Sequence, residues 1–291
     1  GDPVNLQNIV IATNGTAFSA EAVPGQITLE NGALRGYTSY AGSQGTTQLN
    51  ILGGTVADVS TITIGASTTI VLGRIVSPSG VSFTGTGFSP SGSTHFGYGN
   101  AGFPAYLADV LTGTVSYTRV GATTPTNQFG TTGSVTSAVL DVNFTARTLN
   151  ASVGITMPAA GNQAGGSWTL TAANVPFAFN SFVAFTGGGR LTVSNGNGQN
   201  SNTNGDLSGW LEGSFVGATL NGALFGYGLT DQTGTAANGV RSAQSINGVL
   251  AFSGPSQNAA AQYREGLVSD PRGVLAIASY IRSFATNNRP E

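Results

Sequence analysis

From Ser134 to Met157, apolar and polar side chains alternate along two consecutive stretches of the sequence. The apolar positions are Ala138, Leu140, Val142 and Phe144 in the first stretch and Leu149, Ala151, Val153, Ile155 and Met157 in the second. A period of two places every second side chain on the same face of an extended strand. The pattern therefore predicts an antiparallel β-hairpin with one face on a core and the other in water.

Short β-forming stretches, separated by glycine-containing turns, fill most of the remaining chain. The 44 glycines supply the turns, and where glycine alternates with large side chains, as in residues 207–215, it indicates a sharply bent sheet such as a small closed barrel. Further strands are expected within residues 8–12, 26–29, 48–52, 62–75, 94–98, 114–120, 167–172, 177–193, 207–216, 220–229 and 245–252. We predict an all-β, antiparallel fold: a small barrel of about eight strands or a barrel-like sandwich.

The strand pattern divides the chain into three parts. Residues 1–64 are weakly patterned and are expected to form an N-terminal β-rich extension. The strongly β-forming stretch that begins near residue 65 opens the expected barrel domain, residues 65–254. The remaining residues, 255–291, form a C-terminal tail that holds a larger share of charged residues than the barrel.

The tail carries the one helical signal of the chain. Residues 269–271 read Ser-Asp-Pro, a helix cap followed by a proline suited to the first turn. Apolar residues then recur at helical spacing, which predicts an amphipathic helix at about 271–285. This helix either docks on its own barrel or engages a neighbouring subunit or partner. In the second case the contact residues are Val274, Ile277, Ile281 and Phe284.

Charge and composition exclude several classes of function. Ten arginines and no lysine stand against twelve acidic residues, so the formal charge is −2 and no basic patch for nucleic acid is expected. No run of apolar residues is long enough to predict a transmembrane helix. The absence of cysteine excludes disulfides, a thiol nucleophile and cysteine-based metal sites.

The beginning of the chain suggests where the protein works. It starts Gly1-Asp2-Pro3, without an initiator methionine or the apolar core of a signal peptide. We expect the mature form of a secreted or cell-surface protein after removal of its signal peptide. A shortened recombinant chain is the alternative.

Several segments, in this order and spacing, resemble a known β-barrel domain. They are Leu72-Gly73-Arg74, His95-Phe96-Gly97-Tyr98-Gly99, and residues 113–126, 137–144, 207–218 and 246–252. The pattern covers roughly residues 65–254. It resembles the C-terminal β-barrel of FecR-domain-type surface proteins of Gram-negative bacteria and, more remotely, the eight-stranded barrels of transferrin-binding-protein-like surface lipoproteins. The resemblance implies a small antiparallel barrel, export across the inner membrane, and work done through binding rather than catalysis.

This chain departs from the FecR-domain pattern in three ways. It has no cysteine for a lipid anchor, its first 60 residues do not read as a FecR domain, and it has an added C-terminal segment. The resemblance therefore does not extend to FecR-type signalling.

Candidate chemistry is sparse. A Ser-His-Asp triad would need His95, the single histidine, but no Gly-x-Ser-x-Gly nucleophile elbow accompanies it. We therefore expect no enzyme and assign no catalytic residue, metal or cofactor. His95 and Met157 are retained as candidate haem ligands, because some barrels of the resembling kind bind haem. The alternative is a loop or strand position for His95 and a core position for Met157.

Two further patterns in the sequence are candidate binding sites. The loop at residues 195–206 resembles calcium-binding loops rich in Gly and Asp, but its single carboxylate favours an ordinary loop. Aromatic residues in the second half of the chain suggest either a sugar-binding surface or core packing. They are Trp168, Phe177, Phe179, Phe182, Phe185 and Trp210.

Two functions remain. The first is a structural, self-assembling surface subunit whose terminal extensions engage neighbours, the partners being other copies of the chain or another surface protein. The alternative is a surface barrel that binds haem, another apolar molecule or a host factor.

Overall fold

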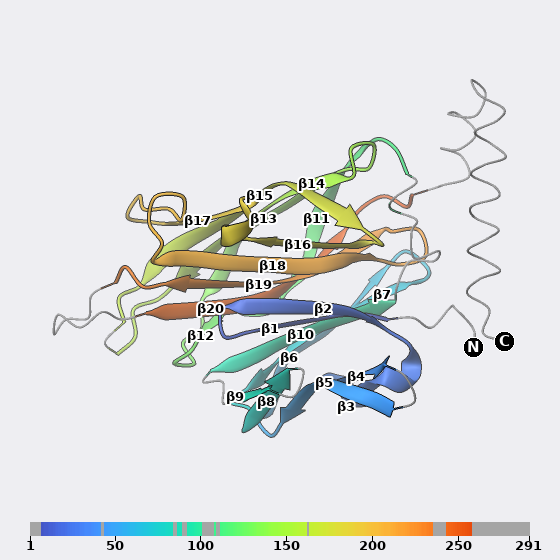
Figure 1. The fold of residues 1–291 in the computed structure, drawn as a ribbon, viewed down its shortest axis with the longest axis horizontal. Coiled ribbons are helices and arrows are strands. Elements are labelled where there is room, and N and C mark those ends of the chain that lie inside the picture. Colours follow the sequence, from blue (N-terminus) through green and yellow to red (C-terminus); the bar gives the residue numbers. More distant parts are fainter. Residues whose placement is uncertain are drawn as a thin grey trace.

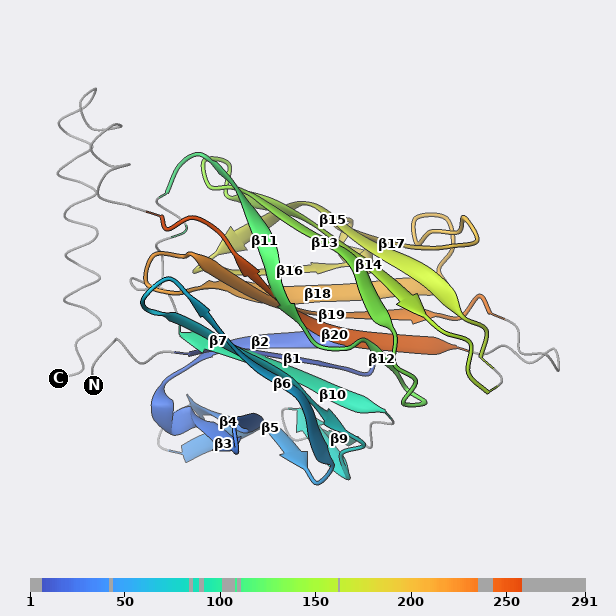
Figure 2. The same ribbon diagram turned by 180° about the vertical axis from the view of Figure 1, so that it is seen from behind.

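The computed structural model describes residues 7–41, 44–83, 86–88, 92–100, 108, 111–161, 163–234 and 243–257. These residues form antiparallel strands in three sheets, shown in Figures 1 and 2. The strands are β1 (Gln7–Thr13), β2 (Thr16–Ala22), β3 (Ile27–Glu30), β4 (Ala33–Ala41), β5 (Gln44–Leu52), β6 (Thr55–Ile64), β7 (Thr68–Val76), β8 (Gly80–Phe83), β9 (Thr86–Phe88), β10 (Ser93–Asn100), β11 (Thr114–Ala122), β12 (Thr126–Asn127), β13 (Ser134–Asn143), β14 (Thr148–Met157), β15 (Gly166–Ala178), β16 (Ser181–Phe185), β17 (Leu191–Asn195), β18 (Leu207–Val216), β19 (Gly222–Asp231) and β20 (Gln244–Ser253). Two short 3-10 helices, η2 (Pro24–Gln26) and η3 (Thr186–Gly188), interrupt them.

The described residues between 7 and 100 form an N-terminal sandwich of two five-stranded sheets. One sheet has the order β2-β1-β10-β7-β6 and the other has the order β3-β4-β5-β8-β9. The core between them includes the fully buried side chains Ile9, Leu34, Ile75 and Phe96. The described strands of the segment expected as a β-rich N-terminal extension, residues 1–64, are therefore paired within the chain.

The rest of the described chain closes into an eight-stranded antiparallel barrel, β11-β13-β14-β15-β16-β18-β19-β20, in which β20 pairs with β11. Strand β17 follows β16 after η3 and pairs with the first part of β15, and β12 pairs with β20. The predicted all-β antiparallel barrel is confirmed. The hairpin predicted from the alternating pattern is β13–β14, whose inward side chains, such as Leu140 and Val153, are fully buried.

Aromatic side chains fill one end of the barrel. Phe215 on β18 is completely buried, and four aromatic rings surround it. Its ring centroid lies 6.0 Å from that of Tyr117, 5.6 Å from Phe144, 5.2 Å from Phe177 and 5.7 Å from Phe182. This end of the barrel is therefore a packed core and not a channel.

The N-terminal sandwich packs on the outer wall of the barrel formed by β18, β19 and β20, as both ribbon views show. A third apolar cluster lies in this junction and includes Val10, Leu72, Leu224 and Val249. Asn247 of the barrel accepts a hydrogen bond from the backbone N–H of Gly15 at 2.9 Å and donates one to the carbonyl of Thr16 at 2.9 Å. Apolar burial and buried polar bonds together hold the two parts in one arrangement.

The strand pairing places the domain boundary later than residue 65. Strands β6 and β7, on either side of that position, pair with each other, and β7 pairs with β10 in the sandwich, whereas the barrel begins with β11. The reason is that β7 lies between two cores: Ile70 and Leu72 face the barrel, and Ile75 faces the second sheet. A strand that is apolar on both faces does not reveal to which sheet it belongs.

The tail lies almost entirely beyond the described residues, which end at Gln257. The helix expected at about 271–285, with Val274, Ile277, Ile281 and Phe284, is outside them. Within the described part of the chain, no helix has the length and apolar character needed to cross a bilayer.

Candidate functional site

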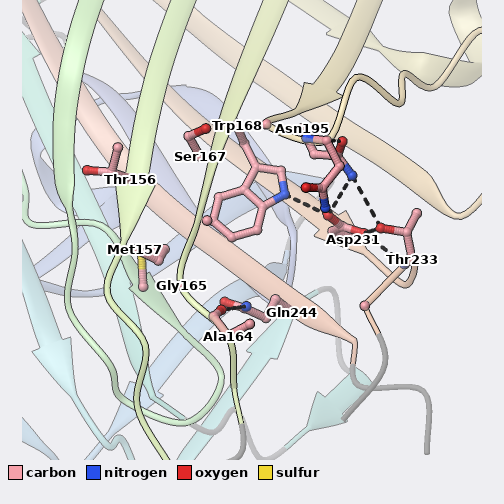
Figure 3. Close-up of a pocket in the computed structure, with 14 residues that line it drawn as sticks. Thr156, Met157, Ala164, Gly165, Ser167, Trp168, Asn195, Asp231, Thr233 and Gln244 are labelled. Atoms are coloured by element: carbon pink, nitrogen blue, oxygen red, sulfur yellow. Dashed lines mark hydrogen bonds between the residues drawn. The ribbon is translucent and has the colours of Figure 1, made fainter. Parts of the chain in front are cut away.

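The end of the barrel opposite the aromatic cluster is hollowed into a pocket of about 720 Å³ (Figure 3). It lies where β14, β17 and β19 end and where β15 and β20 begin, so its walls come from separate strands of a closed sheet. We refer to it as the mouth pocket. Its lining residues are Thr156, Met157, Ala164, Gly165, Gly166, Ser167, Trp168, Asn195, Gly196, Asn197, Asp231, Thr233, Gly234 and Gln244.

A buried carboxylate organises one wall of the mouth pocket. Asp231 Oδ2 accepts hydrogen bonds from Trp168 Nε1 at 2.7 Å and from Asn195 Nδ2 at 3.4 Å. Its Oδ1 accepts from the backbone N–H of Thr233 at 2.8 Å and from the Thr233 hydroxyl at 2.6 Å. Figure 3 shows these groups turned toward one another from three different strands and a loop. Four donors therefore fix the carboxylate without a cation.

The loop expected at residues 195–206 is held by its own side chains beside the pocket. Asn195 Oδ1 accepts hydrogen bonds from the backbone N–H groups of Asn197 and Gln199, both at 3.1 Å. Such bonds from an asparagine to the backbone two residues on define a compact turn. Among the described residues, no group of three or more acidic or histidine side chains is placed to hold a metal ion.

The opposite wall is built around Gln244 at the start of β20. Its Nε2 donates to the carbonyl of Ala164 at 3.2 Å, and its Oε1 accepts from Asn127 Nδ2 at 3.3 Å. The lining thus consists of amides, hydroxyls, one indole, one thioether and a single charged group, Asp231. This set can exchange hydrogen bonds with a ligand, and within it the Thr233 hydroxyl already donates to the Asp231 carboxylate.

His95 lies away from this pocket, on β10 at the junction of sandwich and barrel, and it is completely buried. Its Nδ1 shares a hydrogen bond with the hydroxyl of Thr123, and its Nε2 shares one with the hydroxyl of Thr126, both at 2.7 Å. Both ring nitrogens are therefore engaged, and neither is open to a haem iron. Met157 is buried in the barrel wall beside the mouth pocket, so the structure does not bring the two candidate ligands together as an axial pair.

The buried histidine should make stability depend on pH. Burial, and then the charge of Arg74, lower the pKa of His95 from 6.5 to about 3, with Asp58 opposing the shift. The folded protein holds a neutral imidazole, whereas the unfolded chain takes up a proton below about pH 6.5. Because the unfolded state then binds more protons, we expect the free energy of unfolding to fall by up to about 1.4 kcal/mol per pH unit between pH 6.5 and 3.

Urea unfolding of the wild type and of His95→Gln at several pH values measures this contribution. The variant should be less stable at pH 7, because the two threonine hydroxyls lose their shared partner. Its stability should also fall less steeply toward low pH. If stability changed with pH equally steeply in the two proteins, the lowered pKa of buried His95 would be contradicted.

The six aromatic residues considered as a sugar-binding surface do not share one surface. Phe177 and Phe182 are buried in the barrel core. Trp168 lines the mouth pocket, and Phe185 stacks on Trp210 on the outer wall with ring centroids 4.9 Å apart. Phe179 lies at the β15–β16 turn and is 58% exposed.

Sequence reasoning missed Asp231, Asn195 and Gln244 as pocket residues. Each stands at the end or the beginning of a different strand, and no short motif connects them. The sequence patterns point separately to Trp168, to Met157 and to the loop that begins at residue 195, but nothing in them places these in one pocket.

Comparison with known proteins adds little. No protein-family model matches the chain, so the FecR-domain resemblance has no support from that comparison, and no curated protein matches it. Among solved structures, transferrin binding protein B of Haemophilus parasuis matches 86% of this chain at 11% identity and a TM-score of 0.31, and the chain spans 45% of that protein. The N-lobe domain of lactoferrin binding protein B of Moraxella bovis matches 84% of this chain at 9% identity and a TM-score of 0.30. The match covers 99% of the length of that domain. These TM-scores are too low to establish a common fold, so function has to be inferred from the chain's own geometry.

Proposed function

We propose that this chain is a non-catalytic binding protein of the bacterial cell surface or extracellular space and that the mouth pocket is its recognition site. The observation that carries the proposal is the contrast between the two ends of the barrel. One end is filled by Phe215 and its aromatic neighbours, whereas the other is an open hollow of about 720 Å³ lined by fixed polar groups. Concave sites of this size with a few positioned polar groups are typical of ligand pockets.

The lining defines the ligand class. Asp231 is the one charged side chain in the lining, and the other polar side chains are amides, hydroxyls and one indole. An anionic ligand would meet a carboxylate and no cation, so we propose a polar ligand that is neutral or positively charged. Haem and other strongly apolar molecules fit less well, because the aromatic core occupies the interior of the barrel.

Self-assembly through the N-terminal extension has less support. Strands β1 to β6 pair within the chain, so residues 7–64 do not form a free arm. The tail, which carries the other candidate assembly residues, lies outside the described residues. The surface location remains part of the proposal and rests on the low charge and on the resemblance of the sequence to bacterial surface barrels.

A plugged pocket tests the proposal. Ala164 is exposed at the pocket rim, so Ala164→Trp should fill the entrance without disturbing the core. Ala146 is also exposed, lies in the β13–β14 turn at the opposite end of the barrel, and provides the control Ala146→Trp. Thermal shifts of all three proteins are measured with neutral oligosaccharides, linear polyamines and polyanions, each at about 10 mM.

We expect a neutral or cationic class to stabilise the wild type and Ala146→Trp but not Ala164→Trp, and polyanions to have no effect through the pocket. A ligand that stabilises Ala164→Trp as much as the wild type would contradict the assignment of the mouth pocket as the binding site. The absence of any shift in the wild type from neutral or cationic compounds would overturn the proposed ligand class.

A further inference from the structure

A second, smaller hollow lies where strand β2 of the sandwich meets the barrel. Its volume is about 220 Å³, and its lining comes from β1, β2, the β15–β16 turn and β18. We refer to it as the junction cleft. The lining residues are Asn8, Ser19, Ala20, Glu21, Phe179, Ser181 and Ser214.

The floor of the junction cleft contains an unused hydroxyl. Ser214 on β18 is only 3% exposed, and its Oγ has no hydrogen-bond partner. Its neighbour in the lining, Asn8, already donates to the carbonyl of Phe215 at 2.9 Å. A buried hydroxyl without a partner is costly unless something else supplies the bond. Ser214 Oγ is itself covered, so the side chain has to rotate toward the cleft before its hydroxyl can bond to a group that enters.

The wall of the cleft contains an uncompensated carboxylate. Among the described residues, Glu21 takes part in no ion pair and no side-chain hydrogen bond. The residue is exposed on β2, and the partial burial of its carboxyl group against the cleft raises its pKa. The neighbouring Glu212 differs, because its Oε1 accepts from the backbone N–H of Ser19 at 3.2 Å and its Oε2 accepts from Trp210 Nε1 at 2.9 Å. Glu212 is thus engaged inside the protein, whereas Glu21 is not.

The rim of the cleft holds an aromatic ring in an unfavourable backbone position. Phe179 and Asn180 connect the paired residues Ala178 and Ser181, and both have positive φ, 52° and 64°. Two-residue turns of this kind favour Asn or Gly, and a bulky residue is strained there. Asn180 is fixed by its side chain, which accepts from the N–H of Ala108 at 2.9 Å. Phe179 is 58% exposed and lines the cleft.

From these features we infer that the junction cleft binds a single cationic side chain, a lysine or an arginine presented by a partner protein. The carboxylate of Glu21 would pair with the charge, Ser214 Oγ would accept one of its hydrogen bonds, and the Phe179 ring would cover the aliphatic stem or the cation. The volume of about 220 Å³ suits one side chain and lies below the roughly 300–1,000 Å³ of small-molecule sites. This site is separate from the mouth pocket and does not depend on its function.

The test titrates the full ¹⁵N-labelled chain with N-acetyl-lysinamide and N-acetyl-argininamide, with N-acetyl-norleucinamide as the neutral isostere. We expect the cationic compounds to shift the amide signals of Glu21, Phe179 and Ser214, and the isostere to leave them in place. Glu21→Gln should weaken binding at least about ten-fold, because the charge pair is lost while the shape is kept. Glu30→Gln is the control, since it removes the same charge from an exposed carboxylate that lies 3.6 Å from Arg35.

A second variant separates binding from folding. Phe179→Asn removes the ring but places a residue preferred at positive φ in the turn. It should melt at or above the wild-type temperature and still lose several-fold in affinity for the cationic compounds. Equal shifts with the neutral isostere, wild-type affinity in Glu21→Gln, or an equal loss in Glu30→Gln would overturn the inference. Ten-fold tighter binding of the free diamine putrescine would overturn the assignment to a protein side chain.

Discussion

Replacing Phe215 by alanine should lower the free energy of unfolding by about 4 kcal/mol, which is a large fraction of the stability of a typical domain. Phe215 is completely buried, and its ring packs against four other aromatic rings, the nearest being Phe177 at 5.2 Å between centroids. The substitution removes buried apolar surface and leaves a cavity that rings fixed on three strands and the β13–β14 turn cannot close.

Urea unfolding monitored by circular dichroism measures this loss, and two variants calibrate it. Phe215→Leu keeps most of the volume and should lose about 1–1.5 kcal/mol. Phe129→Ala, at a position that is 61% exposed, should change the stability by less than about 0.5 kcal/mol. If Phe215→Ala were no more destabilising than Phe129→Ala, the close packing of aromatic rings around Phe215 would be contradicted.

Adding one methyl group at Gly228 should destabilise the junction between sandwich and barrel by about 2–3 kcal/mol. A Cβ at this position would lie 2.2 Å from the carbonyl carbon of Gly15, 2.4 Å from its oxygen and 2.5 Å from the nitrogen of Thr16. All three are backbone atoms of the β1–β2 turn, so no side chain can rotate away. The turn must move, which also strains the hydrogen bonds that Asn247 makes to it.

Gly228→Ala is compared with Gly205→Ala, because a Cβ at Gly205 would meet no atom within 4 Å. Urea unfolding should show the loss in the first variant and a change below about 0.5 kcal/mol in the second. Limited proteolysis of the folded protein should also cut Gly228→Ala faster, if the sandwich separates more readily from the barrel. Equal stability of the two variants would show that the close approach of β19 and the turn is not required.

The barrel hairpin was predictable because its pattern is local. Residues such as Leu140 and Val153 alternate with polar neighbours, since one face of β13 and β14 meets the core and the other meets water. Burial of one face imposes a period of two on the sequence, whatever the rest of the chain does. The same reasoning found the strands of the barrel and its antiparallel class.

The sandwich was not predictable in the same way. Strand β7 is apolar on both faces, because Leu72 contacts the barrel while Ile75 contacts the second sheet. Its partner β10 is followed by a barrel strand in the sequence, and β10 also pairs with β1, almost 90 residues earlier. Pairing over such separations depends on which surfaces meet in the folded chain and leaves no local periodicity.

The amino-acid sequence by itself determined the fold class, the central hairpin, the low charge and the absence of cysteine chemistry. Only the tertiary structure decided that both nitrogens of His95 are used by threonines, that Asp231 meets Trp168 and Asn195, and that Glu21, Ser214 and Phe179 line one cleft. The physical reason is that strand formation responds to neighbours one or two residues away. A binding site in a closed sheet is instead assembled from strand ends that the barrel and its packed sandwich bring together.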